Sequence, residues 1–161
     1  MFSENIITLA TKVLEQARQK GVMIATAESC TGGLVSASLT EIAGSSDVFD
    51  RGFATYSNEA KHEMIGVDMG LINAKGAVSA DVAKAMAKGV IKHSNAQISV
   101  TTTGIAGPDG ATKDKPVGLV HFGLSFQGAI KHDKCVFDGN RAQVREQAVE
   151  HALNMLLKAL S

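Results

Sequence analysis

Short apolar runs alternate with helical patterns along the whole chain, and this alternation constrains the fold more than any other feature. Apolar residues recur at helical spacing over 6–17, and Gly21 ends that helix. The run 22–27 then predicts a buried strand, and 34–43 predicts a second helix. The pattern continues with strands at 52–57, 98–102, 117–125 and 129–137, and helices at 58–65, 79–93 and 141–160. Together with a hairpin turn at Gln127–Gly128, it predicts an α/β fold, a three-layer α/β/α sandwich around a mixed, mainly parallel sheet.

Length and composition narrow the class of protein. A chain of 161 residues suits one domain, here 1–161, and 45% hydrophobic and 20% charged residues are ordinary globular values. Sixteen basic residues balance sixteen acidic ones, so no net field favours nucleic acid or anionic lipid. The two cysteines form no CxxC pair, and no signal peptide or membrane span stands out. We expect a soluble, cytoplasmic protein with no nucleic-acid or membrane partner. We also expect a homodimer, although no residue pattern demands one.

Three polar clusters follow three of the predicted strands. The segment ESCTGG (28–33) follows the first strand, TYSNEAK (55–61) the second, and TTGIAGPDG (102–110) the third. In open α/β sheets, ligands bind beyond the carboxyl ends of the strands. The three clusters can therefore meet in one crevice, and this convergence is the structural reason to expect an active site.

The first cluster offers two competing nucleophiles, Ser29 and Cys30, beside Thr31, Gly32 and Gly33. A helix start with free N–H groups attracts anions, but the segment matches neither a P-loop nor a dinucleotide-binding motif. It also lacks the GxSxG turn of many hydrolases. In the alternative interpretation Thr31 only caps a helix, and the two glycines allow close packing of that helix on the sheet.

A serine nucleophile needs a base, and the histidines are poorly placed to supply one. Each is better explained as a solvated or structural residue: His62, His93, His121, His132 and His151. No clustered Cys/His pattern suggests zinc, and we expect neither a metal nor a cofactor. Lys61, one turn into a helix at a strand end, is the remaining base, provided that burial or nearby cations lower its pKa. A lone lysine is more often a surface residue.

The third cluster contains Thr103, followed by glycines at 104, 107 and 110. Such a loop can turn several backbone N–H groups toward an anion or an oxyanion. The competing interpretation is a plain flexible loop, since Gly, Pro and Asp mark turns in any case.

Two arginines lie near the start of the last helix. Arg141 and Arg145 are four residues apart and therefore share one helix face. Two guanidinium groups on one face can hold a phosphate, but they can equally pair with Glu146 or Asp138.

Read in order, the motifs resemble the CinA carboxy-terminal domain family. They are TAESCTGG, GSSDVFDRGFATYSNEAK, GAVS, TGIAGPDG followed by KPVG, and GNRAQVR, and the likeness extends over about 6–157. Enzymatic members of this family are nicotinamide-nucleotide amidases. The resemblance therefore implies hydrolysis of the carboxamide of nicotinamide mononucleotide, a small-molecule substrate, to nicotinate mononucleotide and ammonia, without a cofactor.

By motif match, the resemblance makes Ser29 the nucleophile and Lys61 the base. It implies a substrate pocket formed by Thr31, Gly32, Gly33, Tyr56, Thr103, Gly104, Ile105, Ala106, Gly107, Arg141 and Arg145. Which arginine holds the phosphate stays open, and Glu28 could orient Lys61, contact a ribose hydroxyl or be a surface acid. The opposing hypothesis is a nucleotide- or partner-binding module of competence or damage-response type that performs no reaction.

Overall fold

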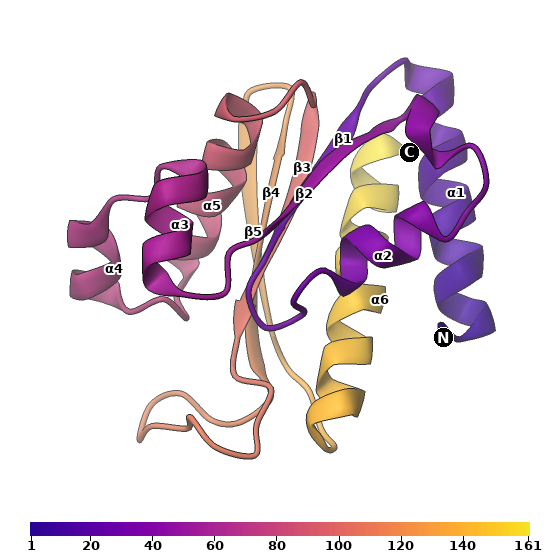
Figure 1. Ribbon diagram of the computed structural model, residues 1–161. Helices are drawn as coiled ribbons and strands as arrows, with labels where there is room; N and C mark the ends of the chain where they lie inside the picture. Colours follow the sequence, from indigo (N-terminus) through magenta and orange to yellow (C-terminus); the bar gives the residue numbers. More distant parts are fainter.

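A five-stranded mixed sheet forms the centre of the computed structural model, which describes all of residues 1–161 (Figure 1). Its strands are β1 (Ile24–Glu28), β2 (Phe49–Ala54), β3 (Ile98–Gly104), β4 (Leu119–Phe126) and β5 (Ala129–Val136). They lie in the order β2-β1-β3-β4-β5, and β1 pairs in parallel with both β2 and β3. Because β4 is antiparallel to β3 and to β5, it alone runs against the other four strands.

Helices cover both faces of this sheet. They are α1 (Glu4–Lys20), α2 (Leu34–Thr40), α3 (Asn58–Ile65), α4 (Met69–Lys75), α5 (Ala80–Lys92) and α6 (Arg141–Leu160), with a 3-10 turn at Ser45–Asp47. In Figure 1, α1, α2 and α6 lie on one side of the sheet and α3, α4 and α5 on the other. A core cluster of 23 buried residues fills the first side and one of 9 the second. The three-layer α/β/α architecture predicted from the sequence is confirmed.

Local sequence signals set the limits of the helices. The Ser3 side chain accepts a hydrogen bond from the N–H of Ile6 and begins α1, and Gly21 ends it with a φ of 64°. Asn140 and Gln143 form a capping box at the start of α6, where each side chain bonds the other residue's backbone N–H. The capping box fixes the point at which the chain, after leaving the edge strand β5, begins α6.

Two regions differ clearly from the predicted elements, and the other predicted bounds agree with the structure to within three residues. The strand expected at 52–57 lies at Phe49–Ala54, because Ser57 instead caps α3 by accepting a hydrogen bond from the N–H of Ala60. No element is predicted between the helices at 58–65 and 79–93, but the structure has α4 there, and the Asp68 side chain begins this helix by accepting a hydrogen bond from the N–H of Leu71. A helix of seven residues with a glycine inside it is too short to show a clear periodic pattern.

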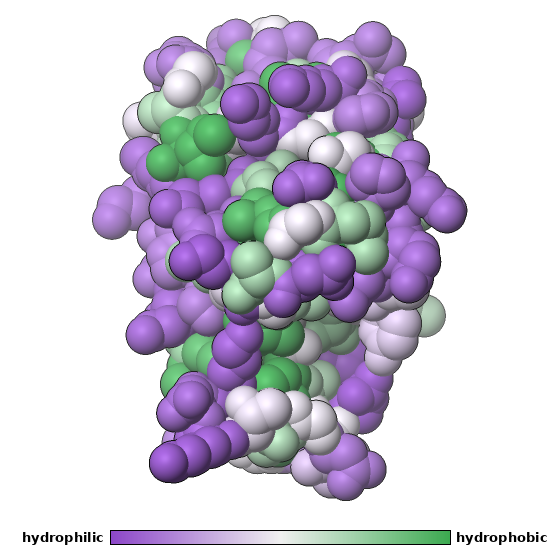
Figure 2. Space-filling model, turned by 90° about the vertical axis from the view of Figure 1, so that its left-hand side faces the viewer, coloured by the Kyte–Doolittle hydropathy of each residue, from purple (hydrophilic) through white to green (hydrophobic).

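The outer face of the α3–α5 layer is covered mostly by hydrophilic residues, with separate hydrophobic patches between them (Figure 2). None of the helices combines the length and the hydropathy that crossing a bilayer requires.

Candidate active site

The three polar clusters lie at the carboxyl ends of three neighbouring strands, as the sheet topology requires. ESCTGG follows β1 at the centre, with β2 on one side and β3 on the other. Direct contacts join the clusters, since Ser29 Oγ lies 3.5 Å from the carbonyl oxygen of Tyr56. The hydroxyl groups of Thr31 and Thr102 are hydrogen-bonded at 2.8 Å. One end of the sheet thus gathers nucleophilic, basic and hydrogen-bonding groups.

Ser29 and Lys61 face each other at this end. The Nζ atom of Lys61 lies 3.1 Å from Ser29 Oγ, and the lysine side chain is almost completely buried, with 1% relative exposure. Nζ also donates to the carbonyl oxygen of Thr55 at 3.0 Å, and the carbonyl oxygens of Tyr56 and Ser57 each lie 3.5 Å away. Three carbonyl groups therefore fix the amine beside the serine, while Ser29 itself is partly accessible.

Burial shifts the pKa of both neighbouring titratable groups. Desolvation lowers the pKa of Lys61, against smaller opposing effects of Cys30 and Glu59. Desolvation also raises the pKa of Cys30 to about 11, so this thiol is protonated at neutral pH. An uncharged thiol does not stabilise a lysine cation. Cys30 therefore does little to offset the lowering of the Lys61 pKa by burial. The lowered pKa increases the fraction of Lys61 that is a neutral amine at a given pH.

Glu28 anchors the turn that carries Ser29. Its side chain is 1% exposed, so it is not a surface acid, and its partners lie in β1, in the turn after Ser29 and in the first residues of α2. The carboxylate accepts hydrogen bonds from the N–H groups of Gly33, Val35 and Ser36 and from the hydroxyl groups of Thr26, Thr31 and Ser36. A carboxylate in this position satisfies the free N–H groups of the first helical turn and complements the helix dipole.

The backbone of the same turn is only partly used. The N–H of Gly32 donates to the carbonyl oxygen of Ser29, and that of Gly33 donates to Glu28. The N–H groups of Cys30 and Thr31 have no protein oxygen as acceptor. These two groups, directly after Ser29, are the free donors of the turn.

Arg141 links the second and third clusters. Its Nη1 atom donates to the carbonyl oxygen of Gly107 at 2.9 Å, and its Nη2 atom donates to the hydroxyl group of Tyr56 at 3.2 Å. Both Arg141 and Tyr56 are exposed. The guanidinium group makes no ion pair, so its charge is available to an anion.

Arg145 contacts the first cluster instead. Its Nε atom donates to the carbonyl oxygen of Cys30, and its Nη2 atom to that of Thr31, both at 3.1 Å. It also makes no ion pair, so neither arginine pairs with Glu146 or Asp138. Although they share one face of α6, the two arginines hold different segments.

Comparison with known proteins identifies the family. The family model described as the CinA C-terminal domain matches residues 6–160. The chain belongs to the CinA C-terminal domain family. The nicotinamide-nucleotide amidohydrolase PncC of Enterobacter agglomerans is 43% identical over 159 residues, which cover 98% of this chain and 97% of that protein.

Some other members of the family are longer than this chain, and solved structures are available for others. A CinA-like protein of Geobacter sulfurreducens is 44% identical over 153 residues, 95% of this chain. This chain spans only 37% of that protein's length, and a similar share of several other curated relatives. The structure of the competence/damage inducible protein CihA from Agrobacterium tumefaciens superposes with a TM-score of 0.95 at 45% identity, and covers 99% of this chain and 98% of that one. A CinA superfamily structure from Klebsiella pneumoniae gives 0.94 at 33% identity, with 98% coverage of both chains.

Within this CinA domain, the third cluster is mostly engaged in holding the fold. The hydroxyl group of Thr103 is buried and donates to the carbonyl oxygen of Ala77 at 2.8 Å. Gly104 is the last residue of β3, and the N–H of Ile105 donates to Leu119. The N–H groups of Ala106 and Gly107, like those of Asp109 and Gly110, have no protein acceptor and are free donors of this loop.

Sequence reasoning missed the part played by Thr55. Its carbonyl oxygen is the nearest acceptor of Lys61 Nζ, and its own hydroxyl group is buried without a hydrogen-bond partner. The only signal was its place at the start of TYSNEAK, within the strand predicted at 52–57 and one residue before Tyr56.

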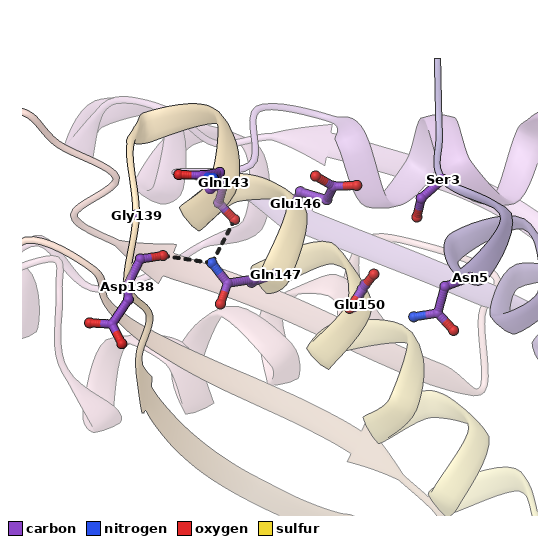
Figure 3. A pocket seen from close by; sticks show the side chains of 8 residues that line it. All are labelled: Ser3, Asn5, Asp138, Gly139, Gln143, Glu146, Gln147 and Glu150. Carbon is purple, nitrogen blue, oxygen red and sulfur yellow. Dashed lines mark hydrogen bonds between the residues drawn. The ribbon is translucent and has the colours of Figure 1, made fainter.

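The largest cavity of this domain lies elsewhere. It has a volume of about 560 Å³ and lies between the start of α1 and the first turns of α6. Figure 3 shows its polar lining, which includes the carboxyl groups of Asp138, Glu146 and Glu150. Three acidic groups repel a phosphate, and neither Ser29 nor Lys61 lines the cavity. Size alone therefore does not mark the candidate site.

Proposed function

We propose that this CinA-family chain hydrolyses the carboxamide of nicotinamide mononucleotide to nicotinate mononucleotide and ammonia. The observation that carries the proposal is the buried Lys61 amine 3.1 Å from Ser29 Oγ. The likeness to the Enterobacter agglomerans amidohydrolase over nearly the whole of both chains supports the choice of substrate. We propose further that 1–161 acts as one amidase domain.

In the proposed first step, Lys61 is a neutral amine and accepts the proton of Ser29 as Oγ attacks the carboxamide carbon. The amine keeps two N–H bonds for the surrounding carbonyl oxygens, of which that of Thr55 is nearest. The tetrahedral intermediate then collapses, the C–N bond breaks, and the lysine ammonium group gives its proton to the leaving nitrogen, which departs as ammonia. Water attacks the acyl-serine by the same route, with Lys61 again accepting and returning a proton.

The negative charge on the carboxamide oxygen needs donors in place before the reaction. The N–H groups of Cys30 and Thr31 are free and directly follow the nucleophile, and those of Ala106 and Gly107 in the third cluster are two further candidate donors. An oxyanion hole formed by such groups contributes roughly 3–4 kcal/mol per donor. Glu28 contributes indirectly, because it holds the turn in which the first two donors lie.

The phosphate of the nucleotide is assigned to Arg141 rather than to Arg145. Arg141 is exposed, unpaired and next to the hydroxyl group of Tyr56, so both side chains can turn toward a bound phosphate. Arg145 is partly buried and already donates to two carbonyl groups. Its role is to position the nucleophile turn.

The deciding experiment measures ammonia and nicotinate mononucleotide released from nicotinamide mononucleotide by purified, chelator-treated protein. Stoichiometric formation of both products by the wild type, and not by Ser29→Ala, supports the proposal. Binding of the nucleotide without product formation would instead identify a binding module.

A further inference from the structure

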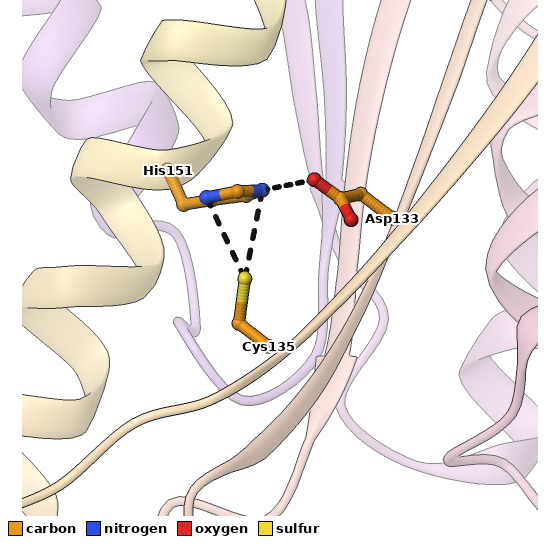
Figure 4. Close-up of side chains that lie close together, drawn as sticks. All are labelled: Asp133, Cys135 and His151. Carbon is orange, nitrogen blue, oxygen red and sulfur yellow. Dashed lines mark hydrogen bonds and ion pairs between the residues drawn. The ribbon is translucent and has the colours of Figure 1, made fainter.

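We propose that Asp133, Cys135 and His151 form a binding site for one Zn²⁺ ion, separate from the candidate active site. Asp133 and Cys135 are alternate residues of the edge strand β5, and His151 lies on α6. A thiol, an imidazole and a carboxylate meet here, with all three ligand atoms within 4.8 Å of one another (Figure 4). None of the three residues contacts Ser29 or Lys61 in the proposed reaction, so the inference is independent of the proposed function.

The chemistry of the donor set favours zinc. Thiolate, imidazole and carboxylate are the three ligand types that Zn²⁺ takes from proteins, and sulfur disfavours Mg²⁺ or Ca²⁺. Three protein ligands leave a fourth tetrahedral position for water. On binding, the Cys135 thiol loses its proton to solvent, and the neutral imidazole and the carboxylate coordinate without further proton loss.

The spacing of the ligand atoms is close to that of a tetrahedral site. With zinc bonds of about 2.0–2.3 Å, tetrahedral N and S ligands lie roughly 3.5 Å apart, and N and O ligands roughly 3.3 Å apart. Sγ of Cys135 is 3.7 Å from Nε2 of His151, and Nε2 is 2.8 Å from Oδ2 of Asp133. To bind the ion, the last pair must open by about half an ångström, and Sγ and the carboxylate, which lie within 4.8 Å of each other, must come to roughly 3.5 Å. The 52% exposed Asp133 side chain can accommodate both changes.

Packing holds the imidazole in place. The His151 ring lies 4.5 Å from the ring of buried Phe122 and 6.2 Å from that of Phe137, measured between centroids. These contacts restrict the ring while leaving it partly exposed, so an ion can reach it. A restricted ligand orientation is what a preorganised metal site requires.

The same three side chains do not form a second nucleophilic site. Sγ of Cys135 lies 3.6 Å from Nδ1 and 3.7 Å from Nε2 of His151, so the thiol is not directed at either nitrogen (Figure 4). An activated cysteine requires a base aligned on one nitrogen. Burial and the nearby Asp133 charge also raise the pKa of Cys135, which opposes a free thiolate.

The test is titration of the full chain with Co²⁺ under a phosphine reductant, followed by displacement with Zn²⁺. We expect one equivalent of Co²⁺ to give the intense visible bands of a tetrahedral ion and a thiolate-to-cobalt charge-transfer band, both lost when one equivalent of Zn²⁺ is added. Cys135→Ser should abolish the charge-transfer band, and His151→Gln should weaken Zn²⁺ binding at least tenfold. Two matched controls should bind as the wild type does: Cys30→Ser removes the other thiol, and His132→Gln removes a histidine on the opposite face of β5.

Three results would overturn the assignment. The first is the absence of a charge-transfer band in the wild type, which decides the matter without any variant. The second is a band that survives in Cys135→Ser or disappears in Cys30→Ser. The third is unaltered Zn²⁺ affinity in a His151→Gln protein whose circular dichroism shows it to be folded. Because the readout is spectroscopic, it is unaffected by whether the protein shows amidase activity.

Discussion

The Nζ atom of Lys61 lies 3.1 Å from the Oγ atom of Ser29, although 32 residues separate the two in sequence. The contact follows from the topology: Ser29 directly follows β1, and Lys61 lies in the helix after β2, the parallel neighbour of β1. The amine is almost completely buried, and this burial is the reason to propose the pair as nucleophile and base.

Replacement of Ser29 by alanine is expected to lower kcat by roughly 10⁴-fold or more, because the acyl-enzyme cannot form. Nucleotide binding should be nearly unchanged, and isothermal titration calorimetry measures it directly. Cys30→Ala is the matched control, because its buried thiol has a pKa of about 11 and is inert at neutral pH. Strong activity in Ser29→Ala, or loss of activity in a folded Cys30→Ala, would make Cys30 the nucleophile.

The pH dependence of kcat/KM should report on Lys61. Burial lowers the pKa of this group, and the reactive form is the neutral amine, so activity should rise with pH and level off above that pKa. The midpoint should lie below the ordinary lysine value. Lys61→Arg keeps the charge but cannot lose its proton, and it should abolish both turnover and the rising limb.

A rising limb that persists in Lys61→Arg, together with appreciable turnover, would assign the limb to another base. His62 is the nearest candidate in sequence, but it is exposed and its Nδ1 atom lies 2.8 Å from the carbonyl oxygen of Val67. His62→Gln therefore serves as the control and should leave the pH profile unchanged.

Much of the fold could be predicted from the sequence because its signals are local. The helix 58–65 and the helix 141–160 coincide with α3 and α6, since caps at Ser57 and Asn140 mark their starts. The hairpin at Gln127–Gly128 is also confirmed, with φ values of 52° and 79° at the two turn residues. Both bounds of the strand predicted at 52–57 were wrong by three residues, because a serine that caps a helix looks the same in sequence as one that continues a strand.

The contacts of the candidate site were harder to predict because they depend on tertiary packing. Glu28 lies between apolar residues and Ser29, and nothing local shows that six donors surround it. The shared helix face of Arg141 and Arg145 was visible, but not their separate partners. The proximity of Cys135 and His151 depends on how α6 packs on the edge strand, which spacing alone does not reveal.

Glu28→Gln is expected to lower the free energy of unfolding by about 2–4 kcal/mol, because either orientation of the amide places its NH₂ group against backbone N–H groups that then lack an acceptor. Urea denaturation measures the change. The exposed Glu63→Gln on α3 is the control and should stay within about 0.5 kcal/mol of the wild type. Equal midpoints for the two variants would show that the carboxylate does not hold the turn.

Substitutions of the two arginines should have different effects on kcat/KM when nicotinamide mononucleotide is compared with nicotinamide riboside, which lacks the phosphate. Arg141→Gln should lower kcat/KM for the mononucleotide by about 10- to 100-fold, the equivalent of one charged hydrogen-bonding group, and leave the poorer riboside nearly unchanged. Arg145→Gln should lower both values alike, because its partners are the carbonyl groups of Cys30 and Thr31 in the nucleophile turn. If Arg141→Gln lowered kcat/KM equally for both substrates, and Arg145→Gln lowered it only for the mononucleotide, the phosphate would be assigned to Arg145. If the wild type had equal kcat/KM for both substrates, the proposal of a phosphate site at this end of the sheet would be wrong.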